Sequence, residues 1–162
     1  MSESRIGRRQ LVRTAAAVAA GGALVGGTGV ATASADEDHR HGHGVLGAWW
    51  VTHTDDPPAE PNTGITVVTF AAGGAFAAAD IRPAGGAGVG AWSATGTHFR
   101  ANYWATVPLG PPDTPGGSVN IRVRGRVHGD SISGTYAVTV YDPSGAELES
   151  GTGTFTGSRL TA

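Results

Sequence analysis

The sequence predicts an all-β fold, an eight-stranded antiparallel up-and-down barrel. No stretch after residue 35 shows the 3.6-residue apolar periodicity of a helix with good helix formers and caps. From Val45 onward, eight strand-like runs are separated by turn residues, and several runs alternate apolar with polar side chains. Eight antiparallel strands joined by short turns leave two unpaired edges unless the sheet closes, so we expect a barrel. The alternative is a two-sheet β-sandwich.

The eight runs and their turns place a single β-barrel domain at residues 45–162. The loop after the first run holds three prolines and the loop after the fifth holds four; proline cannot donate to a strand ladder, so both interrupt the sheet. Glycine-rich turns separate most of the other runs. The expected strands are about 45–54, 64–71, 75–82, 89–95, 97–107, 118–128, 131–141 and 146–160.

Alternation assigns an interior face to the central strands. In the sixth run Val119, Ile121, Val123 and Val127 share one parity, while three arginines occupy the other. In the fifth run, the parity of Phe99 and Tyr103 makes the better interior face. The reversed register would put His98, Arg100 and Asn102 inside, as a site for an anion or a carboxylate. The outer stripe of Arg122, Arg124 and Arg126 reads as a solvated face, with contact to an acidic polymer or partner as its functional alternative.

Residues 1–35 predict an export signal. Arg8 and Arg9 precede a weakly apolar, glycine-dense run, and Ala33-Ser34-Ala35 forms a small-residue cleavage site. The paired arginines resemble the twin-arginine signal, which implies the twin-arginine export machinery as a partner, cleavage near Ala35 and a secreted or cell-envelope location. The alternative is an uncleaved anchor, but five glycines would make a poor membrane-spanning helix, and we expect no stable membrane anchor.

Residues 36–44 predict a disordered, acidic and histidine-rich arm. It has almost no apolar content. His39, His41 and His43 alternate beside three acids and could hold a copper, nickel or zinc ion through imidazole. The alternative, a solvated tail between signal and domain, is favoured because no rigid shell would hold the ligands in place.

Charge and cysteine content exclude several classes of protein. Residues 1–35 carry four Arg against one Glu, whereas residues 36–162 carry seven Arg against twelve acids. A mildly acidic domain is a poor binder of phosphate backbones, so we expect no nucleic-acid partner. Because there is no cysteine, the chain has no disulfide and no thiolate metal site.

Two segments resemble the lipocalins and the wider calycin barrels. Gly47-Ala48-Trp49 looks like their Gly-x-Trp signature, although a second Gly-x-Trp stands at residues 90–92. Residues 153–160 look like the closing strand with its basic residue, Arg159. The resemblance implies that Arg159 packs across Trp49 and closes one end of the barrel, a contact that cation–π attraction also supports. The sequence lacks that family's long helix and its disulfides, and it is equally similar to simpler secreted bacterial barrels that share only the closure.

No strong catalytic motif is present. The sequence has no G-x-S-x-G elbow, P-loop or H-E-x-x-H motif. His53 with Asp55 and Asp56 lies where the first strand meets its loop; the trio could do acid–base chemistry, but a solvated loop mouth is the favoured interpretation. We place the open mouth opposite Trp49, at the loops around Thr63–Gly64 or Gly73–Gly74.

The interior suggests ligand binding without catalysis. Alanines in the third run and glycines in the eighth give a small lining that leaves room for a small apolar or aromatic ligand. We therefore expect an exported monomer that binds such a ligand and uses no cofactor. The alternatives are an isomerase or cyclase acting on a lipid-like substrate, and a packed structural or interaction module with no ligand. The candidate ligand contacts are Phe70, Phe76, Phe99, Tyr103 and Tyr136.

Overall fold

The chain forms a closed antiparallel barrel in which each strand pairs with the next and β8 pairs with β1. The computed structural model describes residues 44–56, 63–82, 86–110 and 116–161. The predicted barrel is confirmed and the β-sandwich alternative is wrong, because the β1–β8 ladder leaves no open edge. The strands are β1 (Gly47–Asp55), β2 (Thr63–Phe70), β3 (Ala75–Arg82), β4 (Ala87–Thr95), β5 (His98–Val107), β6 (Gly117–His128), β7 (Ser131–Tyr141) and β8 (Glu147–Arg159).

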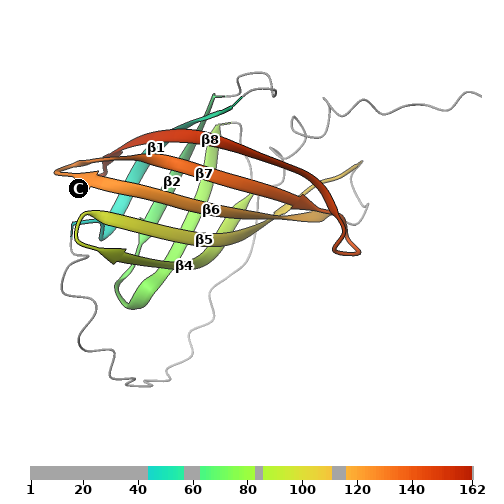
Figure 1. Ribbon diagram of the computed structural model, residues 1–162, viewed down its shortest axis with the longest axis horizontal. Helices are drawn as coiled ribbons and strands as arrows, with labels where there is room; N and C mark the ends of the chain where they lie inside the picture. The colour runs from blue at the N-terminus through green and yellow to red at the C-terminus, as the bar shows by residue number, and fades with distance from the viewer. Residues whose placement is uncertain (1–43, 57–62, 83–85, 111–115, 162) are drawn as a thin grey trace, which may run out of the picture.

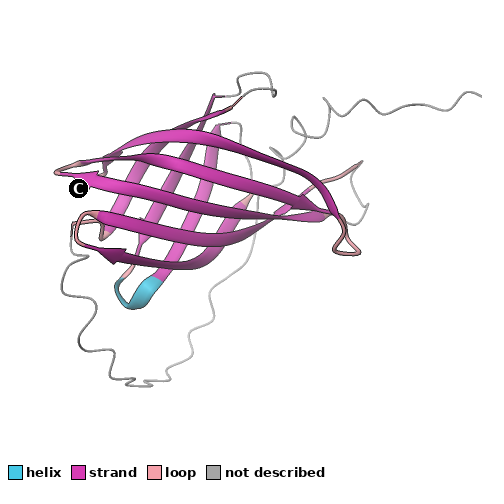
Figure 2. Cartoon of the chain, viewed as in Figure 1, coloured by secondary structure: helices cyan, strands magenta, loops and turns pink. Residues whose placement is uncertain are grey.

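Strands β4 to β8 run across the front of the view in Figure 1, and β1 and β2 cross behind them. Figure 2 shows how strand dominates the described chain: the one helical element there is a short 3-10 turn, η3 (Ala72–Gly74), between β2 and β3. No helix in the described ranges is long and apolar enough to cross a membrane.

The hairpin turns have the backbone geometry that their glycines allow. Gly96 and Gly129 each follow the last residue of a strand and both have φ of 60°. A positive φ at the first position of a two-residue turn matches the twist of the two strands it joins. These turns therefore hold β4 against β5 and β6 against β7 in tight register.

The pairing register sends one parity of every strand inward. Trp49 pairs with Val68 on one side and with Arg159 on the other, and Ala101 pairs with both Trp92 and Val123. The predicted interior face of β5 is therefore right. His98, Arg100 and Asn102 point outward, so the reversed register considered for β5 is wrong.

Interior glycines lie beneath aromatic rings rather than around an empty space. A Cβ at Gly125 would lie 2.4 Å from Phe99 Cζ, and one at Gly88 would lie 2.6 Å from Tyr103 Cδ2. Each ring occupies the space that the missing side chain leaves on a neighbouring strand. At these two positions the space beside the glycine is therefore filled by this chain's own rings.

The buried core gathers in the half of the barrel that contains Trp49. Trp49 is 0% exposed, and its neighbours there are large apolar side chains. Three of them form a run of edge-to-face contacts, with the Phe70 ring centroid 5.1 Å from both the Phe76 and the Phe99 centroids. This half of the barrel is packed solid by Val45, Trp49, Phe70, Phe76, Phe99, Val127, Ile132 and Phe155.

Candidate functional site

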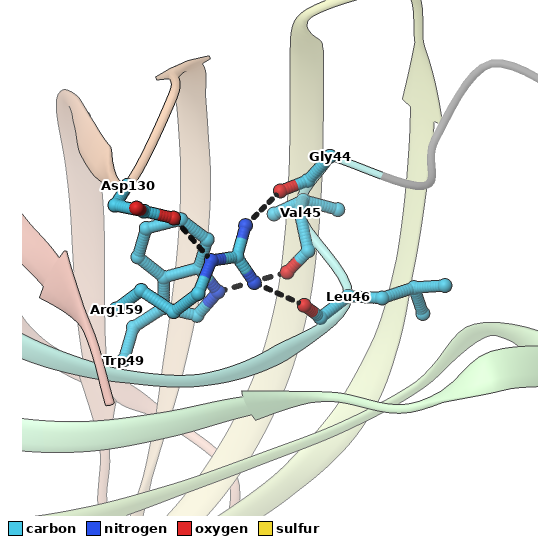
Figure 3. A network of polar contacts seen from close by, with 6 residues as sticks. All are labelled: Gly44, Val45, Leu46, Trp49, Asp130 and Arg159. Carbon is cyan, nitrogen blue, oxygen red and sulfur yellow. Dashed lines mark hydrogen bonds and ion pairs between the residues drawn. The ribbon is translucent and has the colours of Figure 1, made fainter. Parts of the chain in front are cut away.

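Arg159 and Trp49 meet at one end of the barrel, which we call the closed end. The Arg159 guanidinium carbon lies 4.2 Å from the centre of the Trp49 ring, and the Trp49 indole N–H donates to the carbonyl of Val45 at 2.8 Å. Figure 3 shows the guanidinium above the indole, donating to Asp130 and to the carbonyls of Gly44 and Leu46. One side chain thus ties the last strand to the segment that enters the first.

The order and pairing of the strands show which loops lie at the opposite end of the barrel, which we call the open end. Gly47 pairs with Phe70, so the Gly73–Gly74 turn that follows Phe70 lies at the closed end. Thr54 pairs with Thr63, so the β1–β2 connection lies at the open end. The expectation for Thr63–Gly64 is therefore right about the end and the one for Gly73–Gly74 is wrong, because successive turns of an up-and-down barrel alternate between its two ends.

Some inward-facing side chains of the open half are only partly buried, although Val107 and Val119 there are buried. Ala105, Ile121 and Val138 point inward but are only half-buried, unlike the aromatic residues beneath them. A Cβ at Gly151 would approach nothing closer than Val138, at 3.6 Å, so the wall is not crowded there. We call the inward-facing residues of the open half, above the packed floor, the cup.

Of the five predicted ligand contacts, three lie in the packed floor below the cup and two lie in the cup itself. Phe70, Phe76 and Phe99 are buried in the core, at 5% exposure or less. Tyr103 packs on Phe76, with centroids 5.0 Å apart, and Tyr136 lies in the cup. All five face the interior, but only the two tyrosines bring a polar group to the space that a ligand could enter.

Tyr136 reaches across a strand to Asp55. Its hydroxyl donates to the Asp55 carboxylate at 2.5 Å, although β8 separates β7 from β1. Gly153 pairs with both residues, and a Cβ there would lie 2.2 Å from the tyrosine oxygen. Because Gly153 has no side chain, the Tyr136 hydroxyl can pass over β8 and reach Asp55. Burial raises the pKa of Tyr136 above its ordinary value, and the hydrogen bond to Asp55 adds to that shift.

A second carboxylate enters the cup from β3. Asp80 accepts a hydrogen bond of 2.6 Å from the hydroxyl of Thr66, which is 5% exposed. Burial raises the pKa of Tyr103, and the negative charge of Asp80 raises it further. Both tyrosines therefore remain neutral hydrogen-bonding groups beside carboxylates.

His53 also faces the cup, beside Tyr136. The two rings meet edge to face with centroids 5.9 Å apart, and the His53 ring covers Gly64. Asp56, the third member of the predicted trio, instead turns to β8 and accepts a hydrogen bond from the Thr152 hydroxyl at 2.8 Å. Sequence reasoning had placed His53 and Asp55 at a loop mouth but did not connect them with Tyr136, Asp80 or Thr66.

The open end carries most of the negative charge of the described chain. Of the seven acidic residues in the described ranges, only Asp130 lies at the closed end, where it pairs with Arg159 at 2.9 Å. No arginine of the described residues faces into the cup, since Arg82 pairs with the outward-facing Ile65. The acids at the open end are Asp55, Asp56, Asp80, Asp142, Glu147 and Glu149.

Within the described ranges, no three histidine or acidic side chains are arranged to hold a metal ion. His39, His41 and His43, the predicted ligands, lie outside the described residues, as do Arg8 and Arg9 of the predicted export signal.

Two open hollows lie on the outer wall: one of about 420 Å³ over β7, β8 and β1, and one of about 410 Å³ over β4, β5 and β6.

Comparison with known proteins gives one distant likeness. No protein-family model and no curated protein sequence matches the chain. Among solved structures, the chain is similar to one described as "Crystal Structure of Rv2717c from M. tuberculosis". The two share 13% sequence identity with a TM-score of 0.41, over 78% of this chain and 99% of that chain. No inference about function follows from so distant a likeness.

Proposed function

We propose that the cup in the open half of the barrel binds a small ligand with an aromatic or apolar body and a cationic group. The observation that carries this proposal is the pair of inward-facing carboxylates, Asp55 and Asp80, each near a partly buried tyrosine above an aromatic floor. An apolar body would displace water from Tyr103, Ile121 and Val138, and burial of apolar surface favours binding.

The charge of the cup selects the ligand's polar group. A carboxylate that is partly removed from water is stabilised by a nearby cation, and the other acids at the open end add a negative field. The neutral tyrosines can accept or donate hydrogen bonds without adding charge. An anionic ligand would meet carboxylates and no arginine among the described residues of the cup, so we expect it to be rejected.

A matched series of indole compounds tests the proposal. Tryptamine, indole-3-ethanol and indole-3-acetate share the ring and differ in the charge of the side chain, so isothermal titration calorimetry isolates the effect of charge. We expect affinity to fall in that order, and Asp55→Asn and Asp80→Asn each to weaken tryptamine binding about tenfold, the effect of one charge-assisted contact. Asp130→Asn removes a carboxylate at the closed end and should leave binding unchanged.

The same experiment can overturn the proposal. Equal affinity for all three compounds would leave only an apolar pocket, as the sequence alone suggested, and tighter binding of the acetate would contradict the charge argument. If none of the compounds binds and native mass spectrometry of the purified protein finds no copurified ligand, the barrel is a packed structural or interaction module.

The second candidate is an isomerase or cyclase that folds a lipid-like substrate in the cup. The inward-facing His53, Asp55 and Tyr136 favour it, since a histidine and a carboxylate can exchange protons with a bound substrate. The Tyr136 hydroxyl, however, is already donated to Asp55, and its raised pKa disfavours a tyrosinate base. A ligand recovered from the wild-type protein as an isomer of the one recovered from Asp55→Asn would establish catalysis.

We further propose that the chain is exported through the twin-arginine route, cleaved near Ala35 and released as a monomer related to the calycin barrels. The paired Arg8 and Arg9 and the small residues before Asp36 support this. Replacing both arginines by lysine should keep the precursor inside the cell. Continued export of that variant would instead indicate the general secretory route.

A further inference from the structure

Arg122 and Arg124 of the predicted stripe lie beside Arg100 of β5 on the outer wall of the barrel, and from here on these three arginines are called the stripe. Arg100 of β5 and Arg122 and Arg124 of β6 all point outward and are exposed. Arg126 continues the row, but its guanidinium donates to the His98 ring. β5 and β6, which carry these arginines, lie toward the viewer in Figure 1.

The arrangement places like charges directly opposite each other. Arg100 pairs with Arg124 across the β5–β6 ladder, and such cross-strand neighbours have Cβ atoms only about 4.5–5.5 Å apart. No outward-facing residue described on β4, β5, β6 or β7 is acidic, so nothing on this wall offsets the charge. Like charges at this spacing are destabilising, and an anion bound between the two guanidinium groups would relieve the repulsion.

The stripe also lines a surface hollow with hydrogen-bonding groups. The open hollow of about 410 Å³ lies over the same strands. Asn102 pairs with Arg122 and adds an amide, and Ser93 pairs with Arg100 and adds a hydroxyl. The outward-facing residues that line it are Ala91, Ser93, Arg100, Asn102, Arg122 and Arg124.

An aromatic platform lies on the same wall, toward the open end. Trp104 is 47% exposed and its ring centroid lies 5.5 Å from that of Tyr141, with the planes tilted by 33°. Asn120 pairs with Trp104, is only 8% exposed and donates to the Asn102 side chain at 2.7 Å. The hydrogen bond fixes the Asn102 amide between the platform and the arginines.

We propose that this wall binds an anionic polysaccharide, with its acidic groups on Arg100, Arg122 and Arg124 and a sugar ring on Trp104. Guanidinium groups bind carboxylate and sulfate oxygens through paired N–H donors, and the C–H face of a sugar is apolar enough to lie on an indole. A nucleic acid fits less well, since its dense phosphates would meet only the three arginines of this stripe in a domain that is acidic elsewhere.

Affinity electrophoresis of the purified protein, at physiological ionic strength, tests the proposal. The probes are polygalacturonate, dextran sulfate, neutral dextran and a DNA duplex of arbitrary sequence. We expect retardation by one or both acidic polysaccharides and none by neutral dextran. Polygalacturonate and dextran sulfate distinguish a carboxylate from a sulfate as the group that is bound.

Variants locate the binding surface. The triple change Arg100→Gln, Arg122→Gln and Arg124→Gln should weaken binding at least about tenfold, whereas Arg82→Gln, an exposed arginine at the open end, should not. Trp104→Ala should weaken binding, whereas Trp50→Ala, an exposed tryptophan on β1, should not. Tryptamine binding in the cup should be unaffected by the triple variant and by Trp104→Ala, which separates this proposal from the first.

Three results would overturn the proposal. The first is tighter binding of the duplex than of either acidic polysaccharide. The second is equal loss from Arg82→Gln and from Arg124→Gln alone, each of which removes one positive charge; this would indicate net charge rather than a site. The third is no retardation by any acidic polysaccharide while circular dichroism shows a folded barrel.

Discussion

The guanidinium carbon of Arg159, near the end of the last strand, lies 4.2 Å from the centre of the Trp49 ring, near the start of the first. The contact covers an indole that has no exposed surface, and the same guanidinium hydrogen-bonds the carbonyls of Gly44 and Leu46. Closure of this end therefore depends on a contact between the two termini of the barrel.

Trp49→Ala should destabilise the protein by about 3–5 kcal/mol, because it removes a fully buried indole and leaves a cavity. Its neighbour supplies the control: Trp50 points outward and is 39% exposed, so Trp50→Ala should cost no more than about 1 kcal/mol. Urea unfolding followed by far-ultraviolet circular dichroism measures both. Similar losses from the two variants would rule out a special role for Trp49.

Arg159→Lys should cost about 1–3 kcal/mol although it keeps the positive charge. A lysine cannot place planar donors on Asp130 and two carbonyls while covering the indole, and both the cation–π and the charged hydrogen-bond contributions fall. Arg126→Lys is the matched control, because Arg126 is exposed and bonds only His98 among the described residues. An unchanged unfolding free energy for Arg159→Lys would show that charge alone closes this end.

Much of the barrel could be predicted from the sequence because its signals are local. Parity assigned the inward faces of β5, β6 and β7, and the turn residues placed all strand ends to within two residues. The position of Gly73–Gly74 at the closed end followed from simple alternation of turns and was missed. As a result, a loop at the closed end was named as one of the two candidates for the open mouth.

The contacts of the cup were harder to predict, because they depend on glycines, which have no side chain. Tyr136 and Asp55 lie on strands that are not neighbours, and their hydrogen bond exists because Gly153 between them has no Cβ. A glycine read alone suggests empty space. Only the paired register shows which ring fills it, as Phe99 does above Gly125.

Because of this packing, replacement by alanine should change stability in opposite directions at Gly125 and Gly151. A Cβ at Gly125 would lie 2.4 Å from Phe99 and 2.9 Å from Phe155, so Gly125→Ala should overpack the core and cost about 1–3 kcal/mol. At Gly151 the nearest atom is 3.6 Å away, so Gly151→Ala should be neutral or stabilise by up to about 1 kcal/mol through the unfolded chain. Thermal unfolding of the two variants tests the contrast, and stabilisation by Gly125→Ala would contradict it.

The two tyrosines of the cup should make stability fall at alkaline pH. Their pKa values are raised in the folded protein, whereas in the unfolded chain they ionise near about pH 10. Below that pH both states hold the protons and the contribution is fully present. Above it unfolding releases protons, so the unfolding free energy decreases as pH rises toward the folded pKa values.

Urea unfolding at a series of pH values between neutral and strongly alkaline measures this loss, and the tyrosinate absorbance of Tyr103 and Tyr136 should appear together with unfolding. Tyr103→Phe combined with Tyr136→Phe should flatten the alkaline limb relative to the wild-type protein, because the unfolded chain then has two fewer groups to ionise. An alkaline limb of equal slope in the double variant would mean that the two hydroxyls ionise equally readily in the folded and unfolded states.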